Sequence, residues 1–133
     1  MINTILNKIY TELKKIDYIA DVFTYPPENP KGYPYCWIVW EGNESQVLTN
    51  YQDRVIITYK ITLVQEKLEE LKGAKNAEET AEKRCWEIEN LLRGLEIDNV
   101  LRIVPVETIK TYDSNSTRII LEFNIKVELV VDI

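Results

Sequence analysis

The sequence predicts an α+β fold, with two helices packed on one face of an antiparallel or mixed sheet of about five strands. Three observations lead to this prediction: two stretches with apolar residues at helical spacing, several stretches with alternating apolar residues, and short connections between successive strands. The expected order is α-β-β-β-α-β-β. A chain of 133 residues with 45% hydrophobic content is sized for one core, so we expect a single domain over residues 1–133.

The first helix is expected over residues 2–16, where apolar side chains recur with a helical period. These side chains are Ile2, Ile5, Leu6, Ile9, Leu13 and Ile16. A short strand is expected over 21–25. The sequence PPENPKG that follows ends this strand, because proline has no N–H to donate to a strand ladder.

The next segment, YPYCWIVWEG at residues 33–42, predicts a strand with two apolar faces. One face would carry Tyr35, Trp37 and Val39, and the other Cys36, Ile38 and Trp40. A helix can cover only one of these faces, so the other needs a second layer, a long loop or a neighbouring subunit. The segment is therefore a first indication that association completes the fold, with the alternative that Trp37 is an ordinary core residue.

The middle of the chain is expected to contain a polar connection, a strand and the second helix. The connection covers 42–53, the half-buried strand 54–64, and a solvated helical turn or extended loop 65–75. The second helix is expected over 76–94, with Asn76 as N-cap and a buried stripe of Ala77, Ala81, Cys85, Ile88, Leu92 and Leu95. Trp86 lies off this stripe, either packed at the helix border or exposed as an anchor for a partner.

Two strands are expected to end the chain. Residues 99–112 form a strand that Pro105 interrupts, which predicts an edge position or a bulge. A turn follows at 113–116. The last strand alternates so regularly, and is so long, that we expect part of it to project, to bend at a bulge or to pair beyond its own sheet.

Several classes of function are disfavoured by what the sequence contains. There is no histidine, so a Ser-His or Cys-His nucleophile is excluded, and the acidic residues of the charged segments are typical of a solvated face. Asp113, Asn115 and Thr117 imitate the start of a calcium loop but lack the glycine and glutamate that should follow. We therefore expect no enzymatic activity, no cofactor and no metal.

Compartment and partners are constrained by the cysteines, the charge and the N-terminus. Cys36 and Cys85 are expected to be buried free thiols, with a disulfide as the alternative. The first twenty residues carry charges at regular intervals, so neither a signal peptide nor a membrane span is expected, and we predict a soluble cytoplasmic protein. The net charge of −6 without a basic cluster argues against the usual mode of nucleic-acid binding.

The chain resembles the tail terminator, or tail-completion, proteins of long-tailed bacteriophages, also described as minor tail protein U-like. The resemblance rests on the amphipathic first helix, the strand entry Tyr33-Pro34-Tyr35, the strand ITYKITLVQ followed by the helix AEETAEKRCWEIENLL, and the final strand FNIKVELVVDI. Residues 65–75 are longer than the family pattern asks for. The resemblance implies a structural protein of a phage or prophage virion that closes the head-proximal end of the tail tube as a hexameric ring.

The same resemblance implies the partners: further copies of the chain, the tail-tube protein, the head-tail connector, and DNA that passes through the lumen without sequence-specific contacts. Assembly would take place in the cytoplasm of the bacterial host. The acidic charge suits such a lumen, although ordinary solubility explains it equally well. Candidate contacts with other subunits or partners are Tyr33, Trp37, Trp40, Asn43, Glu44, Gln46, Asn50, Tyr51, Trp86, Asp113 and Asn115. The alternatives are a head-tail joining protein or, in a different class, a small acidic ligand-binding or enzymatic domain.

Overall fold

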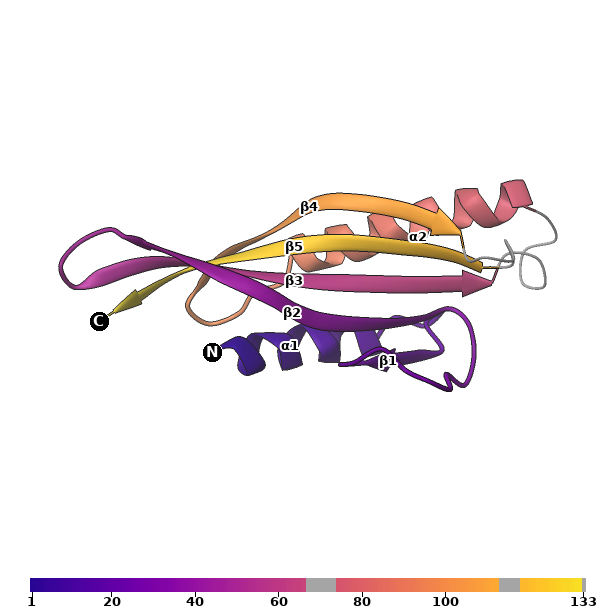
Figure 1. Cartoon of the computed structure of the whole chain (residues 1–133), viewed down its shortest axis with the longest axis horizontal. Helices are drawn as coiled ribbons and strands as arrows, with labels where there is room; N and C mark the ends of the chain where they lie inside the picture. Colours follow the sequence, from indigo (N-terminus) through magenta and orange to yellow (C-terminus); the bar gives the residue numbers. More distant parts are fainter. Residues whose placement is uncertain (67–73, 113–117, 133) are drawn as a thin grey trace.

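Seven helices and strands follow one another in the computed structural model, which describes residues 1–66, 74–112 and 118–132 (Figure 1). They are α1 (Ile2–Lys14), β1 (Asp21–Phe23), β2 (Tyr35–Val47), β3 (Gln52–Glu66), α2 (Ala74–Arg93), β4 (Val100–Tyr112) and β5 (Arg118–Asp132). The predicted order α-β-β-β-α-β-β is confirmed. The turn expected at 113–116 and most of the segment 65–75 lie outside the described residues.

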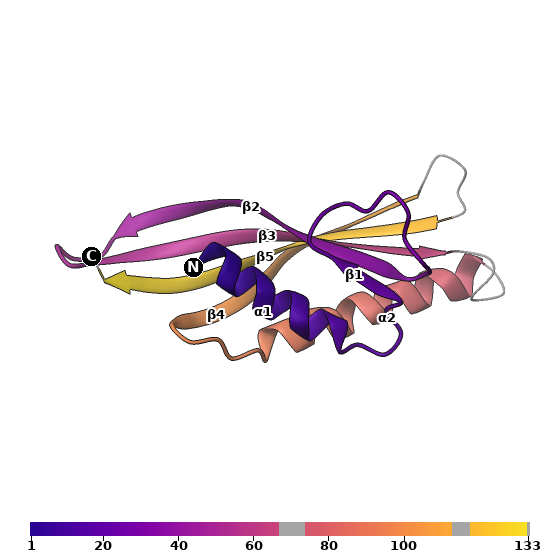
Figure 2. The same ribbon diagram turned by 90° about the horizontal axis from the view of Figure 1, so that it is seen from below.

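The five strands form one sheet in the order β1-β2-β3-β5-β4. Only β1 and β2 run parallel, and the other neighbours are antiparallel, so the sheet is mixed. Both helices lie on the same side of the sheet, α1 near β1 and β2, and α2 near β4 and β5 (Figure 2). The predicted α+β architecture is therefore confirmed. We call the face without helices the open face.

The core lies between the helices and the sheet, and it follows the alternation in the sequence. Every second residue of β3 and β5 is buried on this side, among them Tyr59, Ile61 and Phe123. The helices add the stripes Ile5, Ile9 and Leu13 from α1 and Ala81, Cys85, Ile88 and Leu92 from α2. The hydroxyl of Tyr59 donates a hydrogen bond of 2.7 Å to the carbonyl of Ile2, which ties the start of α1 to the centre of the sheet.

One expectation about the middle of the chain is wrong. The segment 42–53 is not a connection, because β2 continues to Val47 and β3 begins at Gln52, and only four residues join them. These residues form the end of a long hairpin of β2 and β3 that projects from the body of the molecule, and its β3 strand also pairs with β5 from Gln52 onward (Figure 1). Residues 43–47 of β2 form an edge strand whose side chains are exposed on both faces, and such a strand needs no apolar alternation, so the polar sequence concealed it. We call residues 43–52, all of which are exposed, the arm.

Of the three outcomes expected for the last strand, pairing beyond its own sheet does not occur within the described residues. β5 is an inner strand that pairs with β3 along its whole length, from Arg118 to Asp132, and with β4 on its other side. Its length is matched by β3, which has the same 15 residues and extends into the arm. The prediction for Pro105 is confirmed, since β4 is an edge strand with a register shift between Pro105 and Glu107.

Candidate assembly surface

The two faces of β2 differ as the sequence predicts. Cys36 and Ile38 point into the core, whereas Tyr35, Trp37 and Val39 lie on the open face. No helix covers the open face within the described residues. The segment between β1 and β2 lies on the side of the sheet opposite the two helices (Figure 2). The carbonyl of Pro34, at the end of that segment, accepts a hydrogen bond of 2.8 Å from the amide of Ala20.

Three aromatic side chains form a row at the beginning of β2. The ring centroids of Tyr33 and Tyr35 are 5.4 Å apart, and those of Tyr35 and Trp37 are 6.1 Å apart with nearly parallel planes. The guanidinium of Arg118 lies over Tyr33, 5.6 Å from the ring centroid. The row buries Tyr35 but leaves Tyr33 and Trp37 half-buried. Large aromatic surfaces of this kind are typical of protein interfaces.

A charged cluster occupies the open face where the sheet narrows toward the arm. Glu128 accepts hydrogen bonds from Arg102 at 2.6 and 3.1 Å and from Arg54 at 2.5 Å. The two hydrogen bonds from Arg102, helped by the one from Arg54, lower the pKa of the Glu128 carboxyl even though burial opposes this shift. The cluster therefore keeps a nearly buried carboxylate charged by placing an arginine on each neighbouring strand.

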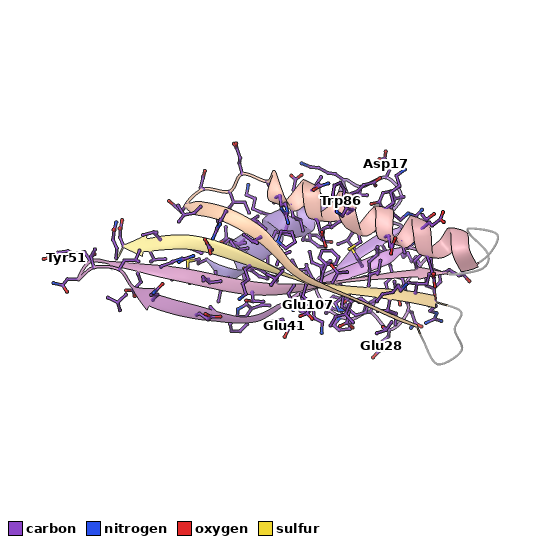
Figure 3. The ribbon with its side chains drawn as sticks, turned by 90° about the horizontal axis from the view of Figure 1, so that it is seen from above. Asp17, Glu28, Glu41, Tyr51, Trp86 and Glu107 are labelled. Carbon is purple, nitrogen blue, oxygen red and sulfur yellow. The ribbon has the colours of Figure 1, made fainter. Side chains whose placement is uncertain are left out.

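The arm carries apolar side chains that nothing in the described chain covers. Val47 and Tyr51 are each 75% exposed, and Leu48 is 48% exposed. Tyr51 lies at the extreme end of the molecule (Figure 3). Trp40, at the base of the arm, is 49% exposed and donates a hydrogen bond of 3.0 Å from its indole nitrogen to Asn43. Exposed apolar residues grouped on one projection indicate a surface that another molecule covers.

Both edges of the sheet are available for pairing. β1 pairs only with residues 35–37 of β2, so within the described ranges the outer side of β2 from Ile38 to Val47 has no partner strand. The outer side of β4 is likewise unpaired among these residues, and three apolar side chains on this strand are about half exposed or more: Leu101, Val106 and Ile109. Free strand edges of this length are templates for pairing with another chain.

The predicted contact residues are therefore divided among three places. The arm and its base bring together Trp40, Asn43, Glu44, Gln46, Asn50 and Tyr51, and the aromatic row contains Tyr33 and Trp37. Trp86 is separate from both, because it lies on α2 and is 68% exposed (Figure 3). Asp113 and Asn115 lie outside the described residues. The exposure of Trp86 shows that this side chain does not pack at the helix border.

The surface also contains residues that sequence reasoning missed. Leu101 and Val106 on the β4 edge are exposed, and Arg54, Arg102 and Glu128 form the charged cluster. Pro105 was a signal for the edge, since proline is confined to edge strands and bulges. The cluster had no signal, because its members come from three strands whose register the sequence does not give.

The described residues also contain a cavity outside these surfaces. A cavity of about 510 Å³ lies between the start of α1, the segment before β4 and the end of β5, and its lining includes Ile5, Ile97 and Leu129. Among the described side chains, no three Cys, Asp or Glu residues are grouped so as to hold a metal ion. The helices of the described ranges are all too short or too polar to cross a membrane.

The two cysteines are free and buried, as expected. Burial raises the pKa of Cys36 to about 12 and that of Cys85 to about 11, with the nearby carboxylates of Asp21 and Glu89 adding to the respective shifts. Thiols of this kind are unreactive at neutral pH, because the nucleophile is the thiolate.

The fold and the surface together define an α+β protein with two free sheet edges and a projecting arm. No family model matches the sequence, and no curated protein does. Among solved structures, the fold is similar to that of a chain in the virion of a native gene transfer agent particle. The two chains share 10% sequence identity with a TM-score of 0.60, and the match covers 92% of each.

Proposed function

We propose that this protein is a structural component of a phage-like virion, and that it acts as a tail terminator, a ring of copies that closes the head-proximal end of the tail tube. The observation that carries the proposal is the combination of two free sheet edges with an exposed apolar arm, since a lone copy leaves both unsatisfied. The similarity in fold to a chain of a gene transfer agent virion supports the same class of protein.

A ring with heterologous contacts accounts for this combination better than a twofold dimer. In such a ring each copy offers two different surfaces, and both sheet edges are used once by every copy. A twofold dimer would pair one edge with itself and leave the other free. The expected ring is a hexamer, with the tail-tube protein on one side and the head-tail connector on the other.

The charge of the chain suits a ring through which DNA passes. The net charge is −6, and two arginines of the open face, Arg54 and Arg102, are each paired with the carboxylate of Glu128. A lumen lined by such a surface would let DNA move without sequence-specific contacts.

The proposal is tested by adding the purified protein to purified tail tubes of the same particle and imaging them by negative-stain electron microscopy. The expected result is a terminal ring on one end of each tube and a block to further growth when tube subunits are added. The variant Val47→Ser/Tyr51→Ser should fold normally and should not cap the tubes, because it removes the apolar arm.

The matched control is Lys83→Ser, which changes an exposed residue of α2 and should cap as the native protein does. Tubes that keep growing in the presence of native protein would overturn the tail-terminator assignment. Binding to isolated connectors but not to tubes would favour the head-tail joining protein instead.

A further inference from the structure

The two free edges of the sheet carry complementary residues at the same heights. Glu44 on β2 pairs with Ile56, Ile56 pairs with Glu128, and Glu128 pairs with Arg102 on β4. Glu44 and Arg102 therefore end the same transverse row, on the same open face, at opposite edges. A second transverse row crosses β3 three residues further on, at Tyr59. In this row Trp40 pairs with Tyr59, Tyr59 pairs with Ile125, and Ile125 pairs with Pro105, which precedes Val106 in the sequence.

These edge residues have unused binding capacity. Glu44 is exposed and makes no ion pair within the described chain, and the Arg102 side chain is 62% exposed, with its hydrogen bonds to Glu128 made by Nε and Nη2 only. Trp40 and Val106 are 49% and 53% exposed. One edge thus offers a carboxylate and an indole, and the other offers a guanidinium and an aliphatic side chain at matching heights.

The direction of the strands permits the two edges to meet. Because β2, β3, β5 and β4 alternate in direction, β4 runs antiparallel to β2. A copy rotated about an axis along the strands would place its β2 beside β4 of the first copy in the antiparallel sense, which continues the pattern of the sheet. Main-chain hydrogen bonds would then add to the charged and apolar contacts.

We propose that the partner of the β4 edge is the β2 edge of a second copy of this chain, with Arg102 of one copy bound to Glu44 of the next and Val106 packed against Trp40. This inference rests on the proposed ring, and it names the interface that builds it. The contact is heterologous, so each copy uses both edges and the assembly closes only as a ring.

The experiment is disulfide cross-linking of two variants, Glu44→Cys and Arg102→Cys, under mild oxidation. Within one copy the two positions are separated by three strand spacings, roughly 14 Å at about 4.8 Å each, which is too far for a disulfide. The native chain is the background control, since Cys36 and Cys85 are buried. Each single variant alone should stay monomeric on a denaturing gel, whereas a mixture of the two should give a two-chain band.

The chain that carries both substitutions should give a ladder of cross-linked bands on the gel, and the largest band should contain all the chains of one ring. Ser45→Cys is the matched control for Glu44→Cys, because Ser45 is also exposed on the arm but lies on the other face of the sheet. Its mixture with Arg102→Cys should cross-link at least tenfold less. Equal cross-linking by either single variant would indicate a twofold interface and overturn the inference.

The same samples distinguish failure of this inference from failure of the proposed function. Rings in negative-stain images without cross-links between the two positions would leave the ring standing and refute the β2 to β4 interface. The absence of both rings and cross-links, with or without tail tubes, would refute the ring and the interface together.

Discussion

The guanidinium of Arg102 donates two hydrogen bonds to the carboxylate of Glu128, across neighbouring strands at the centre of the charged cluster. The pKa of Glu128 is lowered from its ordinary value of 4.5 chiefly by these bonds. The cluster's contribution to stability is therefore complete above that value and is lost as the pH falls through the lower pKa of the folded state.

We expect Glu128→Gln to lower the melting temperature at pH 7, and the difference from the native protein to shrink as the pH is lowered below 4.5. Thermal melts over a pH series measure this effect. Glu122→Gln is the control, because Glu122 lies on the same strand and face but forms only a partly exposed ion pair with Lys60 at 3.2 Å. A Glu128→Gln deficit that stays constant down to the most acid pH would contradict the assigned pKa shift.

The hydrogen bond from Tyr59 to the carbonyl of Ile2 predicts that removal of the Tyr59 hydroxyl lowers the stability of the protein. Tyr59 is fully buried, so Tyr59→Phe should lower the free energy of unfolding by about 1 kcal/mol in urea titrations. Tyr10→Phe removes a hydroxyl for which the described chain shows no hydrogen bond and should leave stability unchanged. An unchanged stability of Tyr59→Phe would mean that this bond does not hold α1 to the sheet.

The buried stripe of α2 predicts that two adjacent leucines contribute very differently to stability. Leu92 is fully buried between α2 and the sheet, whereas Leu91 is 37% exposed. Leu92→Ala should cost about 2–5 kcal/mol of unfolding free energy, because it leaves a cavity. Leu91→Ala should cost about 1 kcal/mol or less. Similar losses for both variants in urea titrations would show that the helix is rotated from the orientation described.

The two buried thiols should react slowly with thiol reagents in the folded protein. With pKa values of about 12 and 11, Cys36 and Cys85 are almost entirely protonated at pH 8 and are shielded by the core. A colourless aromatic disulfide reagent that releases a coloured thiolate should react with neither thiol on a timescale of minutes, and with both after addition of guanidinium. Rapid reaction of the native protein would contradict the burial of these side chains.

The sequence predicted the parts of the fold that depend on the period of apolar residues. The alternation from Val55 to Leu63 and from Ile119 to Leu129 identified the two central strands, and the helical spacing identified α1 and α2. The arm was missed because residues 43–47 of β2 form an edge strand with both faces exposed, which leaves no buried face to mark the strand in the sequence. The complete pairing of β5 with β3 could not be predicted for a related reason, since the length of β3 could not be judged without the arm.

The candidate surface was predictable only in part. Trp40 was an expected contact because it lies in a strand with two apolar faces, and Glu44 and Tyr51 because they lie in a polar segment expected to be exposed. The structure places all three at the arm and its base. Arg102 and Val106 had no such signal. Their relation to Glu44 and Trp40 depends on the order of the strands and on their register, and neither property is contained in the periodicity of a single segment.

The central claim is that this chain covers its exposed apolar side chains and its free strand edges by packing beside copies of itself. Native mass spectrometry of the purified protein over a concentration series, with and without tail tubes, tests this claim most directly. The account predicts a discrete closed species at six times the 15.6 kDa chain mass, formed by the native protein and reduced strongly by Glu44→Lys but not by Ser45→Lys. A single-chain mass at every concentration, with tail tubes present as well as absent, would contradict it.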